Sequence, residues 1–286
     1  MNDIVIIGTT IIDRIMTLKS SFNEHGCNKV NITEFHGGSM RNVAENCAHL
    51  SFSVDFISKF GNDQYALNMI DHLNKLNVNV YGPTIDHNTP IFTKVHGDKS
   101  LMFATTTPDF YLNIEDSIPV AALKNHLFGI TDNSDPMFLS YLLKHGVNTN
   151  WIISAWFPET TFFNMITGVV LNRHEFKSHF GDVDIAKQLL SLHGQGLKWI
   201  VVTLDDEGCV YCYDNKVVWI NTEKKKGHPL GCGDAFISGL VFGLSQDWPF
   251  SIAIKFANHL AQQTLNTIGP VSSNLALIKD SFDHSL

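Results

Sequence analysis

The residues best suited to chemistry in this chain form the run Gly231-Cys232-Gly233-Asp234, which leads directly into an apolar helical pattern. Two glycines allow a tight turn in which the backbone approaches a ligand closely. The first N–H groups of the following helix point into such a turn, and the helix dipole adds to their preference for an anion. Asp234 would stay ionised there and accept the proton of an incoming hydroxyl. The arrangement suits phosphoryl transfer to an alcohol, although a turn that only caps a buried helix is the alternative.

Two further groups of residues have the chemistry of a small-molecule site. The pair Gly37-Gly38 precedes a helical pattern, and Asn42 lies in its first turn, where its amide could reach a ligand. Ordinary helix capping by Ser39 or Asn42 explains the same residues. Asp13 follows the first predicted strand, and the carboxyl ends of parallel strands form ligand crevices. Its carboxylate could bind two sugar hydroxyls, or it could lie in a surface turn.

Polar residues also follow two later strands. Asn172 and Glu175 come after an apolar run at 168–171 and share one face of a helical turn. They could hold the waters of a magnesium ion, or they could mark the start of a helix. Thr203 ends another apolar run, and the polar turn that reaches Gly208 could contact a nucleotide or serve only as a turn.

Composition limits the class of protein. The 286 residues, 44% apolar and 17% charged, suit one large α/β domain. The net charge of −8 and the lack of basic clusters other than 224–226 argue against nucleic-acid binding. The apolar run at the N-terminus is too short for a signal peptide, and we expect no membrane span. Five scattered cysteines predict reduced thiols in a cytoplasmic enzyme; Cys209 and Cys212 have metal-ligand spacing but lie in an alternating strand pattern.

Apolar runs and helical patterns alternate along most of the chain. This rhythm predicts a mainly parallel sheet with helices on both faces. The predicted strands are 4–8, 54–58, 127–131, 151–154, 168–171, 199–203, 210–213 and 217–220, and the main predicted helices are 41–51, 64–76, 234–244 and 250–267.

Two segments interrupt the rhythm. Residues 16–34 are polar and rich in turn formers, and 91–106 reads as two strands, 91–96 and 101–105, around a turn at 97–99. Strands without an intervening helix predict a small separate sheet, which would serve as a lid. We therefore expect one domain over 1–286, with a β lid inserted from about 14–35 and 88–112.

Taken in order, these features resemble the ribokinase-like (PfkB-type) carbohydrate kinase family from end to end. The resemblance implies a three-layer α/β sandwich with a mainly parallel central sheet and a small β lid. Residues 37–46, 239–249 and 263–275 look most like the pseudouridine kinases. The residues that carry the family resemblance are Asp13, Gly37-Gly38, Asn42, 58–63, Asn172, Glu175, Thr203, Gly208, Gly231, Gly233, Asp234 and Asn258.

The resemblance also implies an activity, the Mg²⁺-dependent transfer of the γ-phosphoryl group of ATP to a primary hydroxyl of a sugar or nucleoside. The acceptor that it favours is the 5′-OH of pseudouridine. Asp234 would be the base, and the turn Gly231-Cys232-Gly233 would stabilise the transferring group through the backbone N–H groups of Cys232, Gly233 and Asp234. Pairing of lid strands would give a homodimer. The implied binding residues are Asp13, Gly37, Gly38, Arg41 and Asn42 for the acceptor, Thr203, Gly208 and Asn258 for the nucleotide, and Asn172 and Glu175 for magnesium.

The chain departs from the family pattern near the glycine turn. The segment 228–230 (His-Pro-Leu) replaces the usual threonine and aspartate, which puts a monovalent-cation site in doubt. Asp205 replaces a glycine, and Cys232 a common alanine. A ribokinase- or fructokinase-type enzyme, and a catalytically weakened sugar- or nucleoside-binding protein, therefore stay open. A nicotinamide dehydrogenase is discounted because no Gly-x-Gly-x-x-Gly follows the first strand. The acceptor itself is not given by the sequence.

Overall fold

The computed structural model describes residues 3–97, 101–105 and 110–282. Within them, nine strands form the main sheet in the order β13-β12-β11-β10-β9-β8-β1-β4-β5. Neighbours from β5 to β11 pair in parallel, and β12 and β13 add an antiparallel hairpin at one edge. The strands are β1 (Ile4–Ile7), β4 (Val54–Ile57), β5 (Asn79–Tyr81), β8 (Phe128–Thr131), β9 (Asn150–Ser154), β10 (Gly168–Asn172), β11 (Trp199–Thr203), β12 (Gly208–Tyr213) and β13 (Lys216–Asn221).

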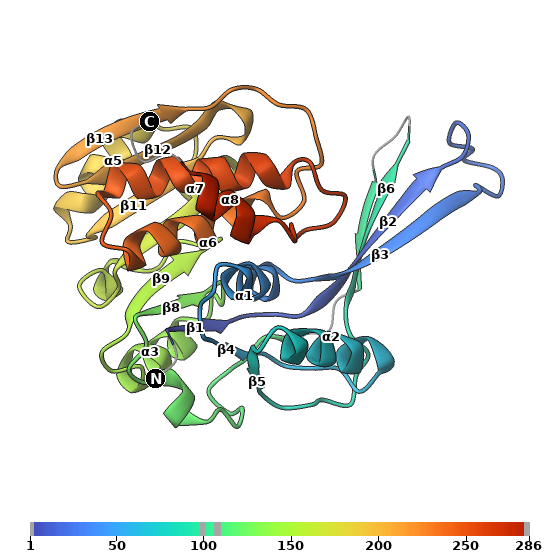
Figure 1. Cartoon of the computed structure of the whole chain (residues 1–286), viewed down its shortest axis with the longest axis horizontal. Coiled ribbons are helices and arrows are strands. Elements are labelled where there is room, and N and C mark those ends of the chain that lie inside the picture. Colours follow the sequence, from blue (N-terminus) through green and yellow to red (C-terminus); the bar gives the residue numbers. More distant parts are fainter. Residues whose placement is uncertain (1–2, 98–100, 106–109, 283–286) are drawn as a thin grey trace.

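Helices cover both faces of this sheet (Figure 1). Successive residues of β1 point to opposite faces, so Ile4 and Ile6 pack in one core while Val5 and Ile7 pack in the other. The first core lies under α1 (Ser39–His49), α2 (Gln64–Lys75), α6 (Cys232–Ser245) and α7 (Phe250–Thr264), with α8 (Leu275–Ser281) outside them; the second lies under α3 (Pro136–His145), α4 (Arg173–Phe180) and α5 (Ile185–Gly194).

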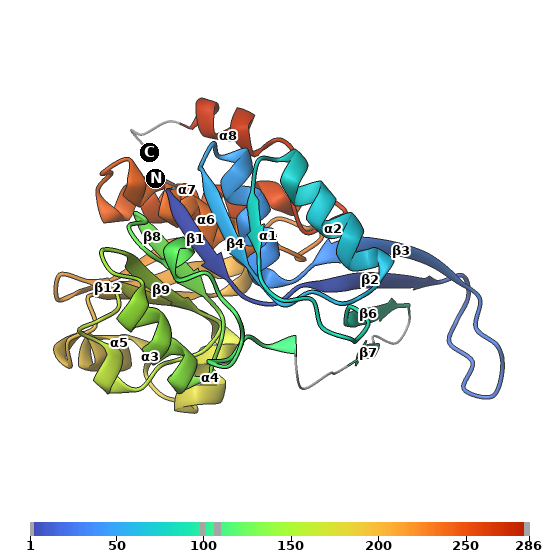
Figure 2. The same ribbon diagram turned by 90° about the horizontal axis from the view of Figure 1, so that it is seen from below.

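A second sheet extends away from this body, as Figures 1 and 2 show. Its described strands have the order β3-β2-β6-β7 and are β2 (Ile11–Leu18), β3 (Val30–Gly37), β6 (Ile91–His96) and β7 (Leu101–Ala104). β2 pairs antiparallel with β3 and parallel with β6. Because β2 follows β1 after three residues and β3 leads into α1 through Gly38, this sheet is attached where those two elements end and begin.

The α/β sandwich and the separate small sheet agree with the sequence-based prediction. In the segment 16–34, expected to be turn-rich, residues 19–29 form the connection, while 16–18 and 30–34 belong to β2 and β3, within the range of about 14–35 expected for the lid. β3 is an edge strand, and four of its eight residues are exposed. A strand in this position can form without a regular alternation of apolar and polar residues. Asp13 consequently lies inside β2 and not in a turn. Two residues of the predicted turn at 97–99, Asp98 and Lys99, lie outside the described residues.

Two other observations bear on the expected class of protein. No helix within the described ranges is long and apolar enough to cross a membrane. The five cysteines are free thiols, and Cys209 and Cys212 lie buried in β12. A cytoplasmic location stays a prediction.

The close contact between α6 and α7 depends on small residues. A Cβ added at Gly239 would lie 2.9 Å from the Cα of Ala257, and one added at Gly243 would lie 2.6 Å from the Cβ of Ala253. These glycines are one helical turn apart, so α7 rests directly on the backbone of α6. The packing fixes the position of the helix that begins at Cys232 and carries Asp234.

We expect Gly243→Ala to lower the free energy of unfolding by about 1–3 kcal/mol, because the added methyl overpacks the α6–α7 contact. Gly194→Ala, at the end of α5, is the matched control: a Cβ added there would meet no neighbouring group of the described chain within 4 Å. The control should gain up to about 1 kcal/mol, from reduced freedom of the unfolded chain. Urea unfolding measures both, and equal effects of the two substitutions would contradict the role of the close contact.

Candidate active site

The first part of the site is the junction of the two sheets. Gly38, between β3 and α1, has φ +99°, and a Cβ there would lie 2.3 Å from the carbonyl oxygen of Thr9. A Cβ on Gly37 would lie 2.3 Å from Oδ2 of Asp13. Gly38 therefore requires glycine, whereas a side chain at Gly37 would displace the carboxylate of Asp13.

The second part is the turn before α6. Gly231 has φ +80°, and a Cβ there would lie 1.8 Å from the carbonyl oxygen of Pro270. The N–H of Ala235 makes the first bond of the helix, 2.9 Å to the carbonyl of Gly231. The turn thus keeps the left-handed form of a glycine turn despite the unusual segment 228–230.

One of the three expected anion donors of this turn is already engaged. The N–H of Cys232 donates to the carbonyl of Pro229 at 3.2 Å, contrary to its expected role toward a phosphoryl group. The N–H groups of Gly233 and Asp234 belong to the first turn of α6, where a helix offers no internal acceptor. These two donors, at the positive end of the dipole, are the ones that suit an anion.

Asp234 joins the two parts. Ser39 Oγ donates to its Oδ1 at 2.5 Å, and Asn42 Nδ2 donates to its Oδ2 at 2.7 Å. Neither Ser39 nor Asn42 caps α1: the N-cap position is Gly38, which makes no side-chain cap bond. Burial raises the pKa of Asp234 to about 6, against the effect of the two hydrogen bonds and the charge of Arg41. A carboxylate that titrates near 6 is ionised at neutral pH and basic enough to accept a proton.

Further carboxyl groups surround Asp234. Burial and the charge of Asp234 raise the pKa of Asp13 to about 6, and the same two causes raise the pKa of Asp132 to about 7. Oδ1 of Asp132 is buried without a hydrogen-bond partner among the residues the structure describes. Burial also raises the pKa of Glu175, whose charge acts on both Asp132 and Asp234. Negative charge therefore gathers at this edge of the sheet.

Sequence reasoning missed Asp132 and Ser39. Asp132 directly follows the strand β8, so its place at the carboxyl end of a parallel strand was a readable signal. Ser39 gave no such signal, because a serine at the start of a helix normally suggests a cap.

The pair expected to bind magnesium forms a capping box at the start of α4. Asn172 Oδ1 accepts from the N–H of Glu175 at 2.8 Å, and Glu175 Oε2 accepts from the N–H of Asn172 at 2.7 Å. The helix-start interpretation is therefore correct for both side chains. The amide oxygen of Asn172 is engaged, whereas Glu175 keeps its second carboxylate oxygen.

A cavity of about 630 Å³ borders the turn before α6 through Cys232 and Gly233. Of the three residues expected to contact a nucleotide, Asn258 lines it and donates from Nδ2 to Cys209 Sγ at 3.3 Å. Thr203 pairs with Asn172 in the sheet. Gly208 is the first residue of β12, and the carbonyl oxygen of Ile220 lies where a side chain of residue 208 would begin. The lining residues are Asn172, His174, Asp205, Asp206, Thr222, Glu223, Lys225, Lys226, Gly227, Pro229, Cys232, Gly233, Asn258, Ala261, Gln262 and Leu265.

Asp205, which stands where the family pattern has glycine, occupies a backbone conformation that favours glycine, with φ +55°. Its side chain is 77% exposed, and its Oδ2 lies 3.8 Å from Nε of Arg173. Arg173 also pairs with Glu207 at 2.9 Å, so a cation lies beside the acidic turn that borders the cavity.

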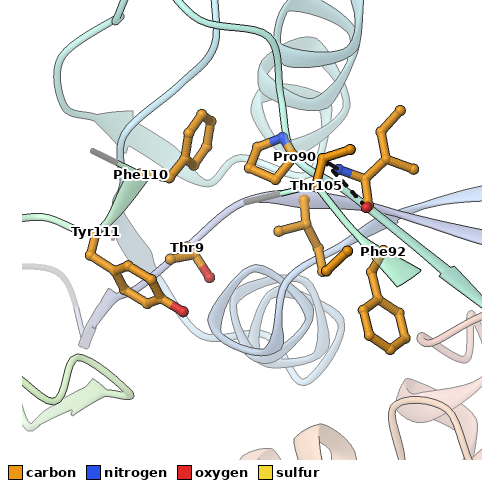
Figure 3. A pocket seen from close by; sticks show the side chains of 9 residues that line it. Thr9, Pro90, Phe92, Thr105, Phe110 and Tyr111 are labelled. Atoms are coloured by element: carbon orange, nitrogen blue, oxygen red, sulfur yellow. Dashed lines mark hydrogen bonds between the residues drawn. The ribbon is translucent and has the colours of Figure 1, made fainter. Parts of the chain in front are cut away.

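A second cavity, of about 240 Å³, lies between the body and the small sheet (Figure 3). Aromatic and aliphatic side chains dominate its walls, and Thr9 connects it to the Gly38 junction. Thr105 Oγ1 accepts from the N–H of Ile91 at 2.7 Å and ties β7 to the start of β6. The lining residues are Thr9, Ile11, Pro90, Ile91, Phe92, Ala104, Thr105, Phe110 and Tyr111.

Arg41, expected to contact the acceptor, is buried beside the site, where its charge acts on Asp13 and Asp234. Only 1% of it is exposed, and it does not appear among the residues that line either cavity. Its guanidinium contacts Glu45 and Asn42. Asp13 and Asn42, by contrast, lie close to Asp234, as expected of one site.

Comparison with known proteins agrees with this geometry. The model of the pfkB family carbohydrate kinases matches residues 1–101 and 137–276. The chain belongs to the pfkB family of carbohydrate kinases. The glycine turn, its aspartate and the small sheet are therefore parts of a kinase fold, and the activity class is phosphoryl transfer to an alcohol.

Individual relatives are distant but cover most of the chain. A guanosine-inosine kinase of Exiguobacterium acetylicum is 25% identical over 93% of this chain and 95% of its own. Fructokinase-2 of Zea mays is 26% identical over 74% and 71%, and pseudouridine kinase of Escherichia coli (strain K12) is 24% identical over 92% and 90%. The solved structure of Arabidopsis thaliana ribokinase complexed with ribose and ATP has a TM-score of 0.80 at 14% identity, with 99% of each chain covered.

The raised pKa of Asp132 gives a stability prediction. A carboxyl group whose folded pKa exceeds its unfolded value binds more protons when folded, so its ionisation destabilises the fold as pH rises from about 4 through about 7. Asp132→Asn removes this cost. Its Tm should match the wild type at pH 4 and exceed it by a few degrees at pH 8, since about 1 kcal/mol corresponds to about 2–4 °C.

Differential scanning fluorimetry of the ligand-free protein across this pH range measures the effect. Asp71→Asn, an exposed carboxylate on α2, is the matched control and should show no pH-dependent gain. A constant difference at all pH values would contradict the buried-charge explanation.

Proposed function

We propose that this protein is an ATP-dependent kinase that phosphorylates the primary hydroxyl of a nucleoside, with the 5′-OH of pseudouridine as the first acceptor to test. The observation that carries the proposal is the pair of hydrogen bonds from Ser39 and Asn42 to Asp234, which joins the start of α1 to the glycine turn before α6. The Asp234 carboxylate is thereby held beside the junction that leads to the smaller cavity. The residues that precede it, Cys232 and Gly233, line the larger one.

The smaller cavity favours a nucleoside over a free sugar. Phe92, Phe110 and Tyr111 offer ring faces and edges suited to a flat base (Figure 3). Two relatives named as nucleoside kinases cover more than 90% of this chain, and a fructokinase covers 74%. The pseudouridine choice rests on residues 37–46, whose Arg-Asn and Glu-Asn pairs resemble that branch of the family. A ribose- or fructose-type acceptor is the alternative.

The proposed reaction uses groups already described. Asp234 accepts the proton of the acceptor hydroxyl, whose oxygen forms the bond to the γ-phosphorus while the bond to the bridging oxygen of ADP breaks. The N–H groups of Gly233 and Asp234 donate to the oxygens of the transferring group. Asp13 would accept bonds from other hydroxyls of the acceptor. The small sheet would act as a lid that keeps water away from ATP.

The carboxylates of Asp132 and Glu175 suit magnesium better than the expected pair of Asn172 and Glu175 does. Asp132 has a buried oxygen without a partner in the described chain, and Glu175 has a second oxygen outside its capping bond. Both lie within the electrostatic reach of Asp234, and a hard cation with oxygen ligands suits such a donor set. Bound there, Mg²⁺ would neutralise phosphate charge. We propose Asp132 and Glu175 as its residues, with Asn172 as the capping partner of Glu175.

The homodimer expected from the sequence remains a proposal. Its support is that the edge strands of the small sheet, β3 and β7, carry the exposed apolar side chains of Ile32, Met102 and Phe103.

Asp234→Asn tests the base. We expect kcat to fall by about 10²–10⁴-fold because the proton acceptor is lost. ATP affinity, measured by calorimetry, should stay close to that of the wild type because the turn is unchanged. Asp71→Asn, which removes an exposed carboxylate, should retain full turnover. A kcat within tenfold of the wild type in Asp234→Asn would remove Asp234 from this role.

The acceptor is tested by the conversion of ATP to ADP with pseudouridine, uridine, guanosine, inosine, ribose and fructose. We expect the highest kcat/KM with pseudouridine, and at least about tenfold less with either free sugar, because neither fills the aromatic cavity. Phosphorus NMR should place the product phosphate on the 5′ oxygen. Preference for ribose or fructose would make the protein a sugar kinase. No turnover, with a raised Tm for one acceptor, would favour the binding-protein alternative.

A further inference from the structure

A continuous set of contacts leads from the surface of α2 to Asp234. Asn42 Nδ2 donates to Asp234 Oδ2 at 2.7 Å, and Arg41 Nη2 donates to Asn42 Oδ1. Arg41 Nη1 donates in turn to Glu45 Oε2, one helical turn along α1. Glu45 Oε1 lies 2.9 Å from Nε2 of His72 on α2. Arg41 is therefore the fixed link between the structural core of α1 and the amide that contacts the proposed base.

The hydrogen-bonding chemistry of this link allows one arrangement. A guanidinium only donates and an ionised carboxylate only accepts, so an amide between them must turn its oxygen to the former and its nitrogen to the latter. Arg41 thus fixes the orientation in which Asn42 donates to Asp234. It also polarises the amide, which strengthens that donation.

Arg41 is itself held firmly. Although burial raises the pKa of Glu45, contacts with His49 and His72 and the charge of Arg41 outweigh it, so the pKa lies well below its usual range. Glu45 is consequently an anion at any pH at which the protein works. His36 from β3 faces the same cluster, and burial and the charges of Arg41 and His72 lower its pKa to about 4, so it adds no competing charge.

We propose that Arg41 is a positioning residue for phosphoryl transfer: held by Glu45, it orients the Asn42 amide toward Asp234 without touching the acceptor. The inference rests on the proposed role of Asp234 as the base. Its consequence is a specific kinetic signature. Loss of Arg41 should reduce kcat about 10- to 100-fold through misplacement of Asp234, with KM for either substrate changed less than about threefold.

Three variants test this role. Arg41→Met removes the donor to Asn42. Arg41→Met/Glu45→Gln removes both charges of the ion pair. It is needed because the single variant leaves the buried charge of Glu45 without its partner, which can prevent folding. Arg41→Lys keeps a cation that can reach one partner and should recover part of the lost kcat. Lys187→Met, which removes an exposed cation on α5, is the matched control and should change nothing.

A readout independent of turnover is the side-chain amide signal of Asn42 in protein labelled with ¹⁵N-asparagine. The signal is assigned by its loss in Asn42→Asp. We expect it to move in Arg41→Met and in the double variant, to return part of the way in Arg41→Lys, and to stay in place in Lys187→Met.

The outcomes separate this inference from the proposed function. An unmoved Asn42 signal with unchanged kcat in the double variant overturns the positioning role, and so does a raised KM at unchanged kcat. A moved signal in the Arg41 variants, together with full turnover of Asp234→Asn, would show that Arg41 orients the Asn42 amide but would remove Asp234 as the base and with it the positioning role in phosphoryl transfer.

Discussion

The hydrogen bonds from Ser39 and Asn42 to Asp234 are the constraint on which the site depends. They join residues separated by 195 and 192 positions in the chain: Ser39 and Asn42 lie at the start of α1, and Asp234 lies at the start of α6. Each helix starts after a glycine that has no room for a side chain, and α6 is held by its close contact with α7. The main sheet, both helices and the glycine turns thus converge on one carboxylate.

The same convergence concentrates negative charge. Asp13, Asp132, Asp234 and Glu175 all have raised pKa values, and burial is the largest cause for each. Their ionisation costs stability in the ligand-free protein, and binding of a cation would offset that cost.

Local patterns were enough to predict much of this fold. β-branched runs such as 199–203 and the amphipathic helices follow from periodicity, and the glycine turn at Gly231 follows from backbone sterics. The bounds of the edge strand β3 could not be read in the same way, because four of its eight residues are exposed and its polar residues outnumber its apolar ones.

The partners of the site residues depended on tertiary contacts that no spacing encodes. Ser39 reads as a cap but binds Asp234, whereas Asn172 and Glu175 read equally well as a metal pair and form a cap. The sequence left open whether Arg41 faces a ligand or covers the helix, and in the structure it is buried against Glu45 and Asn42. A side chain's type showed what chemistry it could do, and the packing around it decided which partner it has.

The short connections of the small sheet have a mechanical consequence. β2 leaves β1 after three residues, β3 enters α1 through Gly38, and Gly38 is pressed against the carbonyl of Thr9. The chain that enters β6 is fastened as well, because the N–H and Oγ1 of Thr89 donate to Asp63 at the start of α2. The inner end of the small sheet is therefore tied to the body at several points, so a displacement of its outer end would leave the atoms beside Asp234 nearly in place.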